Sequence, residues 1–600
     1  MEPTRRRRSF SSRLIGGIAQ RLDRRYGWHR LPKPIAILTL IGLRDRLREE
    51  NLYDTVAEAP PAEPLPADSR WRTARTIDGT YNDLSSPQMG SRGSRFGRNV
   101  PLGKTWPQRV PDIMEPNPRV VSRELLTRDE FIPATTLNLL AGAWLQFEVH
   151  DWMSHEKVHD QPWELPLSED DEWPERPMRI DRTKPDQTRD AKSATPPTFL
   201  TDDSHWWDGS QVYGNRDDFA VRLRTGEDGK LRIADDGLPP ADLQAGLDLS
   251  GVAGAFWAGL GVLHTLFMLE HNAICDRLRA QYPSWSDDRL FDTARLVNAA
   301  LMAKIHTVEW TPAIIAHPTT ILAMNAQWWG LVGERARKRF GRIGKGEVLS
   351  GIPGSPTNHH GVPYSLTEEF VAVYRMHPLL PDNYTFRSVG DDSVLQERTF
   401  HEIAAVEARN RLVELSMPNA LYSFGIAHPG AITLHNFPAF LQKFERPDGV
   451  LLDLAAVDIM RIRERGVPRY NEFRRLFRLK PASTFEDLTA NKEWVEQIRR
   501  VYANDIENVD LMIGLYGEQP PSGFGFSDTA FRVFILMASR RLKSDRFFTT
   551  DYTPKVYTKT GLKWIDDNSF VSVLLRHYPQ LEPALRGVKN GFAPWNRVKA

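Results

Sequence analysis

Cysteine is almost missing from the chain. Of 600 residues, only Cys275 carries a thiol, which excludes an internal disulfide and any metal site built from several thiolates. We interpret Cys275 as a small buried apolar residue rather than a reactive group. Such sparse cysteine usage is typical of a reducing compartment, although it is a weak indication.

A surplus of one charge is also missing. Lys and Arg number 78, and Asp and Glu number 77. Binding to phosphates needs a basic excess, so a nucleic-acid partner is not expected. The basic start MEPTRRRRSF is not followed by a proper apolar stretch, and therefore does not resemble a secretory signal peptide.

Long apolar runs are rare. The longest nearly uncharged one, LSGVAGAFWAGLGVLHTLFML, covers residues 249–269 and could span a bilayer by its length alone. Its glycines, its His264 and the charged EHNAICDRLR that follows favour a buried core helix instead. The sequence therefore predicts a cytoplasmic or peripheral-membrane protein, with no convincing transmembrane segment.

Composition divides the chain into three parts. Residues 1–56 mix Arg with Leu, Ile, Phe and Trp, which predicts amphipathic helices. These helices could face a membrane surface, or could equally pack on the body with a solvated basic face. Residues 57–132 are rich in Pro and Arg without periodicity, as expected of an extended segment wrapped on the surface.

Helical patterns dominate residues 133–600, and strand-like alternation is scarce. We expect an all-α fold: one large, mainly helical catalytic domain with very little β structure. Helices are predicted over Ala255–Gln281, Leu452–Phe477 and Lys492–Tyr516, among others. Large helical enzymes of this kind often bury a flat cofactor between helices.

The first candidate site combines two histidines with a tyrosine. Gln146 and His150 are four residues apart, so on a helix they share one face and can address the same small ligand. Taken alone, a histidine on an apolar helix is more often a satisfied core residue. Tyr374 and His377 lie three residues apart, and Pro378 disfavours helical geometry at His377. The second imidazole is thus expected at a helix break, where it can project into a cavity.

The second candidate is a set of oxygen donors. Ser204, Asp208, Ser210 and the carbonyl of Trp206 present oxygens at even spacing, and Asp151 adds a second carboxylate. Hard oxygen ligands with two carboxylates suit Ca²⁺. The alternative is a polar turn capped by Asp208.

The third candidate could hold a carboxylate. Arg540 and Arg541 form a pair in LMASRRLKSDR, and an arginine fork binds carboxylates in two-point contact. His306 and Thr311 in AKIHTVEWTP are five residues apart and become near neighbours only if the helix ends at Pro312. Alternatively, the arginines form solvated faces or salt bridges, and His306 is an ordinary core residue.

Taken together, these motifs resemble one family. VYRMHPLLP is similar to the proximal segment, and QFEVHDW to the distal helix, of cyclooxygenases and fatty-acid α-dioxygenases, which belong to the animal-type haem peroxidase superfamily. Further similarity covers most of the chain, from WHRLPKPIAILTLIGLRDRLREENLYDT through KIHTVEWTP to ASRRLKSDRFFTTDYTPKVYTKTGLKW. The resemblance is greatest to the α-dioxygenase branch.

The resemblance implies roles for individual residues. His377 would be the proximal haem ligand, His150 the distal acid–base residue assisted by Gln146, and Tyr374 the radical residue. His306, Thr311 and Arg541 would bind the substrate carboxylate, with Arg540 in reserve. The oxygen donors from Asp151 and the 204–210 loop would bind Ca²⁺ and so support the distal helix.

Two departures from the peroxidases bear on the cofactor. Val149 precedes the distal histidine where those peroxidases carry an acidic residue that tethers haem, so haem b is expected without ester links. Their distal arginine is also missing from this run, which weakens the expectation of a vigorous general peroxidase.

The implied reaction abstracts the α-hydrogen of a fatty acid through a tyrosyl radical and adds O₂ to give a 2-hydroperoxy acid. Alternatives are a haem peroxidase oxidising small donors, an oxygenase attacking a mid-chain carbon, and a haem-less membrane-associated scaffold. No obligate protein partner is inferred.

Overall fold

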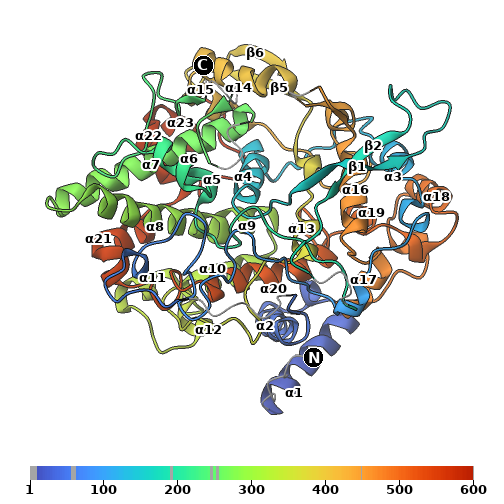
Figure 1. Ribbon diagram of the computed structural model, residues 1–600, viewed down its shortest axis with the longest axis horizontal. Helices are drawn as coiled ribbons and strands as arrows, with labels where there is room; N and C mark the ends of the chain where they lie inside the picture. The colour runs from blue at the N-terminus through green and yellow to red at the C-terminus, as the bar shows by residue number, and fades with distance from the viewer. Residues whose placement is uncertain are drawn as a thin grey trace.

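Helices make up most of the computed structural model, which describes residues 10–55, 63–189, 194–242, 247–251, 256–446 and 449–598. The expected mainly helical, single peroxidase-like domain is confirmed. Figure 1 shows α4, α9, α13 and α20 near the centre of the view and the other helices around them. The α-helices are α1 (Phe10–Tyr26), α2 (Lys33–Glu50), α3 (Pro118–Val121), α4 (Leu139–Val149), α5 (Ser210–Tyr213), α6 (Asp217–Leu223), α7 (Ala258–Gln281), α8 (Asp287–Ile305), α9 (Thr311–Ile314), α10 (Pro318–Trp329), α11 (Glu334–Phe340), α12 (Glu347–Ser350), α13 (Glu368–Val373), α14 (Val406–Leu415), α15 (Met417–Ile426), α16 (Leu454–Glu464), α17 (Tyr470–Leu476), α18 (Lys492–Val501), α19 (Leu511–Gly517), α20 (Asp528–Ser544), α21 (Pro554–Asp567), α22 (Phe570–His577) and α23 (Glu582–Leu585).

Strands in the described residues form antiparallel pairs that stand apart from one another. Most are too short to build a sheet with a core of its own, and the longest pair, β1 with β2, lies at the right of Figure 1. The pairs are β1 (Lys157–Leu165) with β2 (Met178–Thr183), β3 (Ala241–Asp242) with β4 (Leu247–Asp248), β5 (Asn383–Arg387) with β6 (Val394–Thr399), and β7 (Phe444–Glu445) with β8 (Leu451–Leu452).

The centre of the core is the short helix α4. Its sequence LLAGAWLQFEV is apolar on nearly all sides, and such a helix is stable only when surrounded. It packs against α7 and α15. Residues 258–269 of the apolar run at 249–269 form the first half of α7 and are buried except for the half-buried Leu269, as a core helix requires, while residues 252–255 of that run lie outside the described residues.

Two capped helices face each other beside α4. The Thr367 side chain accepts a hydrogen bond from the Phe370 amide and starts α13, and the Ser527 side chain accepts one from Ala530 and starts α20. α13 packs on α20 and ends at Tyr374, where the chain turns toward His377. The tyrosine and the histidine therefore leave the helix end in a fixed direction.

The Pro- and Arg-rich segment braces α13. Gly97 pairs with Thr367 as an isolated β-bridge, and Arg98 makes a 2.8 Å contact with the buried Glu369. The Asn99 amide donates to the same carboxylate at 2.6 Å. A buried carboxylate with several donors is well satisfied, so this part of the expected wrapping segment also fixes a core helix.

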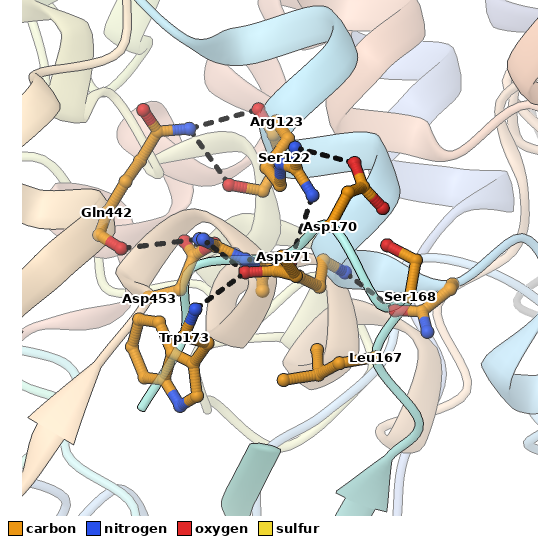
Figure 2. A network of polar contacts seen from close by, with 12 residues as sticks. Ser122, Arg123, Leu167, Ser168, Asp170, Asp171, Trp173, Gln442 and Asp453 are labelled. Atoms are coloured by element: carbon orange, nitrogen blue, oxygen red, sulfur yellow. Dashed lines mark hydrogen bonds and ion pairs between the residues drawn. The ribbon is translucent and has the colours of Figure 1, made fainter. Parts of the chain in front are cut away.

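A polar network ties the region after β1 to the start of α16. Arg119 contacts Asp171 at 3.0 Å and Asp453, the N-cap of α16, at 2.7 Å. Figure 2 shows Asp171 and Asp453 close together, with Gln442 reaching Ser122 from the other side. This network anchors α16 at its first turn.

Two predicted helices were too long. Residues 452–477 form α16 and α17, separated at Gly466, whose φ of 64° places the backbone in the left-handed region and whose added Cβ would lie 1.8 Å from the Thr105 carbonyl oxygen. Residues 492–516 likewise form α18 and α19. Periodic apolar residues continued across both breaks and concealed them.

The described N-terminal residues form the two expected helices. α1 and α2 pack on each other, and α2 also contacts α10 and α20. The basic start, residues 1–9, lies outside the described residues. Across the part of the chain that is described, no helix combines the length and apolar character needed to cross a bilayer.

Candidate active site

The distal helix α4 meets the Tyr374–Leu380 segment at two places. Near its start, a Cβ added to Gly142 would lie 3.3 Å from the Cβ of Leu379. Beyond its end, Trp152 packs edge-on against Tyr374, with ring centroids 5.6 Å apart. Gln146 and His150 come from the part of α4 between these contacts. The structure therefore brings the first set of candidate residues into one region.

His150 is the C-cap of α4 and is half-buried. Its Nδ1 is fully buried without a hydrogen-bond partner, and burial lowers its pKa to about 4. His264 on α7 has both ring nitrogens buried without hydrogen-bond partners. Burial lowers the pKa of His264 to about 3, and the nearby His150 also contributes to this decrease. Gln146 accepts a 2.8 Å hydrogen bond from the Trp257 indole. The distal side thus holds neutral imidazoles.

His377 lies on the Tyr374–Leu380 segment rather than on α4, at a short 3₁₀ turn after α13. Its Nδ1 is 2.7 Å from Oδ2 of the buried Asp458 on α16, although the N–H does not point straight at that oxygen. Oδ1 of Asp458 accepts from Arg375. No described residue hydrogen-bonds to Nε2 of His377, so this nitrogen is available to a ligand.

Tyr374 is surrounded by aromatic rings. Phe534 stacks on it at 4.6 Å, Phe370 lies at 4.6 Å, and Trp152 closes the remaining side. Burial raises the pKa of Tyr374, so the phenol keeps its proton at any physiological pH. The hydroxyl has no hydrogen-bond partner among the described residues.

One small cavity collects the predicted carboxylate-binding residues around Tyr374. His306, Thr311 and Arg541 all line it. Arg541 is 2% exposed, and its Nε and Nη2 have no hydrogen-bond partner in the described part of the chain. Its guanidinium lies over the rings of Trp152 and Trp207, at 3.6 and 4.4 Å from the centroids. The remaining lining residues are Trp207, Thr307, Met324, Gln327, Phe370 and Ala538.

Arg540 faces away from this cavity. Its guanidinium donates to the carbonyls of Val362, Pro363 and Ser365. Consecutive helix positions are about 100° apart around the axis, so only one member of the pair can face the cavity. The geometry therefore favours Arg541 over Arg540 as the carboxylate-binding residue.

His306 is held in one tautomer. The Trp144 indole N–H donates to its Nδ1 at 3.1 Å, so the ring proton is on Nε2. Burial and then the charge of Arg541 lower the pKa of His306 well below its usual value, which keeps the ring neutral. A neutral imidazole with a free Nε2–H is a hydrogen-bond donor for an anion.

A π-helical turn links His306 to Thr311. The turn covers His306–Trp310, and the Thr311 hydroxyl donates to the His306 carbonyl at 2.7 Å. The two residues are thus neighbours, as predicted, but the cause is a wide helical turn rather than a helix end at Pro312. A bound carboxylate would compete with the carbonyl for the hydroxyl proton.

Three of the oxygen donors of the second candidate meet: Ser210 contacts both Asp151 and Asp208. Asp151 is fully buried, and its Oδ1 accepts from the amide and hydroxyl of Ser210, at 2.6 and 2.8 Å. Burial raises the pKa of Asp151, and the nearby charge of Asp208 raises it further. Oδ2 of Asp208 has no hydrogen-bond partner among the described residues. The Ser204 hydroxyl accepts from the amide of Trp206 at 3.1 Å.

Within the described residues, no group of three or more His, Cys, Asp and Glu side chains could hold a metal ion. A cation here would therefore need hydroxyl and carbonyl oxygens in addition to the two carboxylates.

A second, apolar cavity adjoins the first. Met324 and Gln327 line both. From there the second cavity extends between α2, α10 and α20 toward Arg44 and Glu347, which form an ion pair of 3.0 Å. Its walls include Ile37, Leu40, Ala323, Ile352, Phe531 and Ile535. The sequence alone did not reveal this lining, since apolar helices occur throughout the chain.

Comparison with known proteins defines the class. The family model described as animal haem peroxidase matches residues 74–588. The chain therefore belongs to the animal haem peroxidase family, and is an oxidoreductase whose family cofactor is haem.

Within that family it belongs with the alpha-dioxygenases. It is 38% identical to the alpha-dioxygenase PIOX of Oryza sativa subsp. japonica, over 96% of this chain and 94% of that protein, and 37% identical to alpha-dioxygenase 2 of Arabidopsis thaliana, over 98% and 94%. A crystal structure of Oryza sativa fatty acid alpha-dioxygenase with palmitic acid matches with a TM-score of 0.91 at 37% identity, covering 98% of each chain. Peroxidase A from Dictyostelium discoideum, at 20% identity and a TM-score of 0.68, shares the fold.

The residues present fit a haem. Imidazoles come from two segments that contact each other on either side of Gln146 and His150. His150 has an unsatisfied buried nitrogen, and among the described residues nothing hydrogen-bonds to Nε2 of His377, while its Nδ1 faces a carboxylate. A metal-bound histidine commonly has its second nitrogen held in this way. No acidic residue adjoins His150 on its N-terminal side, where Val149 stands.

Proposed function

We propose that the protein is a fatty-acid α-dioxygenase that binds its substrate by the carboxylate and adds O₂ at the α-carbon to give a 2-hydroperoxy acid. The observation that carries this proposal is Arg541. A buried guanidinium whose Nε and Nη2 have no hydrogen-bond partner favours an anionic ligand, and the cavity it lines also contains the Tyr374 ring. A head group there brings the α-carbon close to the phenol.

Each residue of the proposed site has one task. Arg541 and the Nε2–H of His306 hold the carboxylate, Thr311 adds a hydroxyl, and Tyr374 reacts with the α-carbon. When bound, haem supplies the oxidising power for one-electron chemistry. Tyr374, having lost its phenolic hydrogen, takes a hydrogen atom from the α-carbon, and O₂ then adds to the resulting carbon radical. The peroxyl radical takes a hydrogen atom back from the Tyr374 hydroxyl, which gives the 2-hydroperoxy acid and restores the tyrosyl radical. The aromatic wall excludes water from this step.

On the two faces of the cofactor, His377 would bind the iron and His150 would act as acid and base, with Gln146 beside it. The low pKa of His150 supports this role, because the ring is then free to accept a proton from a bound hydroperoxide. Val149 supports non-covalent attachment of haem b, since its side chain cannot form an ester.

We assign the apolar cavity between α2, α10 and α20 to the acyl chain. It continues from the head-group cavity through Met324 and Gln327. Its apolar walls would contribute about 0.8 kcal/mol per buried methylene, which favours long-chain acids such as the palmitic acid bound to the Oryza sativa relative.

A Ca²⁺ ion is proposed between Asp151 and the 204–210 loop. Support comes from two buried carboxylates within interaction range that share the contact with Ser210, one of them with an oxygen that makes no hydrogen bond and only a 3.7 Å ion pair with Arg295. Calcium titration by calorimetry tests this proposal: wild-type protein should bind one ion and Asp208→Asn should not. Equal binding by the two proteins would exclude the site.

Peripheral membrane contact is proposed for α1 and α2. Leu38 is 65% exposed, and Ile18, Tyr26 and Ile35 are exposed as well. α2 lines the proposed acyl cavity, so a lipid substrate could enter from a membrane. Sedimentation with anionic vesicles should decrease in a Leu38→Glu variant, and unchanged sedimentation would contradict the contact.

Product analysis decides the reaction. We expect aerobic incubation with palmitate to place oxygen at the α-carbon, as identified by mass spectrometry. Oxygen at a mid-chain carbon would instead identify a mid-chain oxygenase. Oxidation of guaiacol-type donors without fatty-acid oxygenation would identify a plain peroxidase, and the lack of a Soret band would identify a haem-less scaffold.

A further inference from the structure

A buried ion cluster lies directly behind His377. Asp458 is 0% exposed and uses its two carboxylate oxygens for different partners: Oδ2 is 2.7 Å from His377 Nδ1, and Oδ1 accepts from Arg375. The backbone of Arg375 is held in place in turn by Tyr516, whose hydroxyl donates a hydrogen bond to the Arg375 carbonyl. The segment after α13 thus meets α16 at one carboxylate, and α19 supports that segment through Tyr516.

The charge state of this cluster follows from its contacts. Burial disfavours a lone carboxylate, but one oxygen of Asp458 contacts the guanidinium of Arg375 and the other lies 2.7 Å from His377 Nδ1. Asp458 is therefore an anion that shares its charge between a guanidinium and an imidazole. A buried anion needs both partners to be stable.

We propose that Asp458 and Arg375 act as opposed positioning residues for His377: Asp458 makes the imidazole a stronger electron donor, and Arg375 limits that effect. This inference rests on the proposed ligation of haem by His377. A hydrogen bond from Nδ1–H to a carboxylate gives the ring partial imidazolate character and raises its basicity at Nε2. Arg375 draws charge toward the other carboxylate oxygen and weakens that hydrogen bond.

The two residues should therefore have opposite effects when removed. In the haem-loaded full-length protein, Asp458→Asn should lower the iron–imidazole stretching frequency in the resonance Raman spectrum and shift the reduction potential to more positive values. Arg375→Met should raise the frequency and shift the potential to more negative values. Arg375→Lys keeps the charge and should restore wild-type behaviour.

A matched control is available on the same helix. Asp453, labelled in Figure 2, is also buried, also contacts an arginine, and caps the N-terminus of α16, but its partner is Arg119 and it contacts no histidine in the described residues. Asp453→Asn should reduce thermal stability without moving the Raman line or the potential. If Asp458→Asn fails to fold, Asp458→Glu retains the charge at a longer reach and should lower the frequency by a smaller amount.

Several results would overturn the inference. These are an unchanged Raman line in Asp458→Asn, shifts of the same sign in Asp458→Asn and Arg375→Met, and an equal shift in Asp453→Asn. A separate variant tests the ligation itself: His377→Gly should lose the iron–imidazole line and regain it with added imidazole. If His377→Gly keeps the line, the proposed ligation is wrong. If it loses the line while the Asp458 variant matches wild type, only the present inference fails.

Discussion

Replacing Arg541 should separate recognition of the carboxylate from every other property of the enzyme. Arg541→Met keeps most of the apolar stem that packs on Trp152 and Trp207 but removes the two unpartnered N–H groups. Hydrogen bonds to charged groups contribute about 1.5–3 kcal/mol each, so losing two of them costs about 3–6 kcal/mol. Since a factor of ten corresponds to about 1.4 kcal/mol, kcat/KM for palmitate should fall roughly 100- to 10,000-fold.

Oxygen uptake on palmitate and on methyl palmitate measures this loss. Wild-type enzyme should strongly prefer the acid, whereas Arg541→Met should treat acid and ester nearly alike, because neither finds a cationic partner. The Soret band and the melting temperature show whether the variant is intact. Arg540→Met is the matched control: it removes hydrogen bonds to the 362–365 backbone and should lower stability while keeping the preference for the acid.

The reasoning would be refuted if Arg541→Met retained the wild-type preference for acid over ester. The same holds if Arg540→Met lost that preference while Arg541→Met did not. Either result would mean that the buried guanidinium is structural and that the head group binds elsewhere.

Three further predictions test other parts of the site. Tyr374→Phe should reduce oxygen uptake on palmitate to background while leaving the Soret band intact, because only the phenolic hydrogen is removed; persistent uptake would rule out Tyr374 as the radical residue. Ala323→Phe should fill part of the acyl cavity and lower kcat/KM for palmitate roughly tenfold or more, as expected when two methylenes lose about 0.8 kcal/mol each, with little effect on octanoate; equal effects on both acids would place the acyl chain elsewhere. His264 has a pKa of about 3 in the folded protein against 6.5 ordinarily. On acidification the unfolded state therefore binds a proton at this residue before the folded state does, and stability falls as the pH drops below about 6.5. His264→Phe should make the melting temperature decline less steeply between pH 6.5 and 4.5, and an unchanged slope would contradict this assignment.

Local sequence spacing was enough to single out the groups that are proposed to react. Tyr374 and His377 sit at a helix end because Pro378 follows, and Gln146 and His150 share a face because they are four residues apart. Both arrangements depend only on residues that are close in the sequence, so the tertiary structure does not change them. The choice between Arg540 and Arg541 was different: it depends on which side of α20 faces α13, and no local pattern determines that.

Contacts across long distances in the sequence escaped prediction. Asp458 is 81 residues from His377 and stands in an ordinary helical stretch, so nothing near it indicates a role. The shared lining of the two cavities likewise results from the packing of α10 between distant helices. The π-helical turn at His306 was missed because its residues fit an α-helical pattern equally well.

That turn has a consequence for how such a site can change. A π turn contains one residue more than an α-helical turn, and it is typically found where function requires it. Deleting one residue from 306–310 would restore regular winding and rotate everything downstream, including Thr311, by about 100°. In the proposed site, the depth at which the fatty-acid carboxylate is bound therefore depends on the one additional residue of this π turn. Selection should therefore remove insertions and deletions within residues 306–310 more readily than side-chain substitutions there.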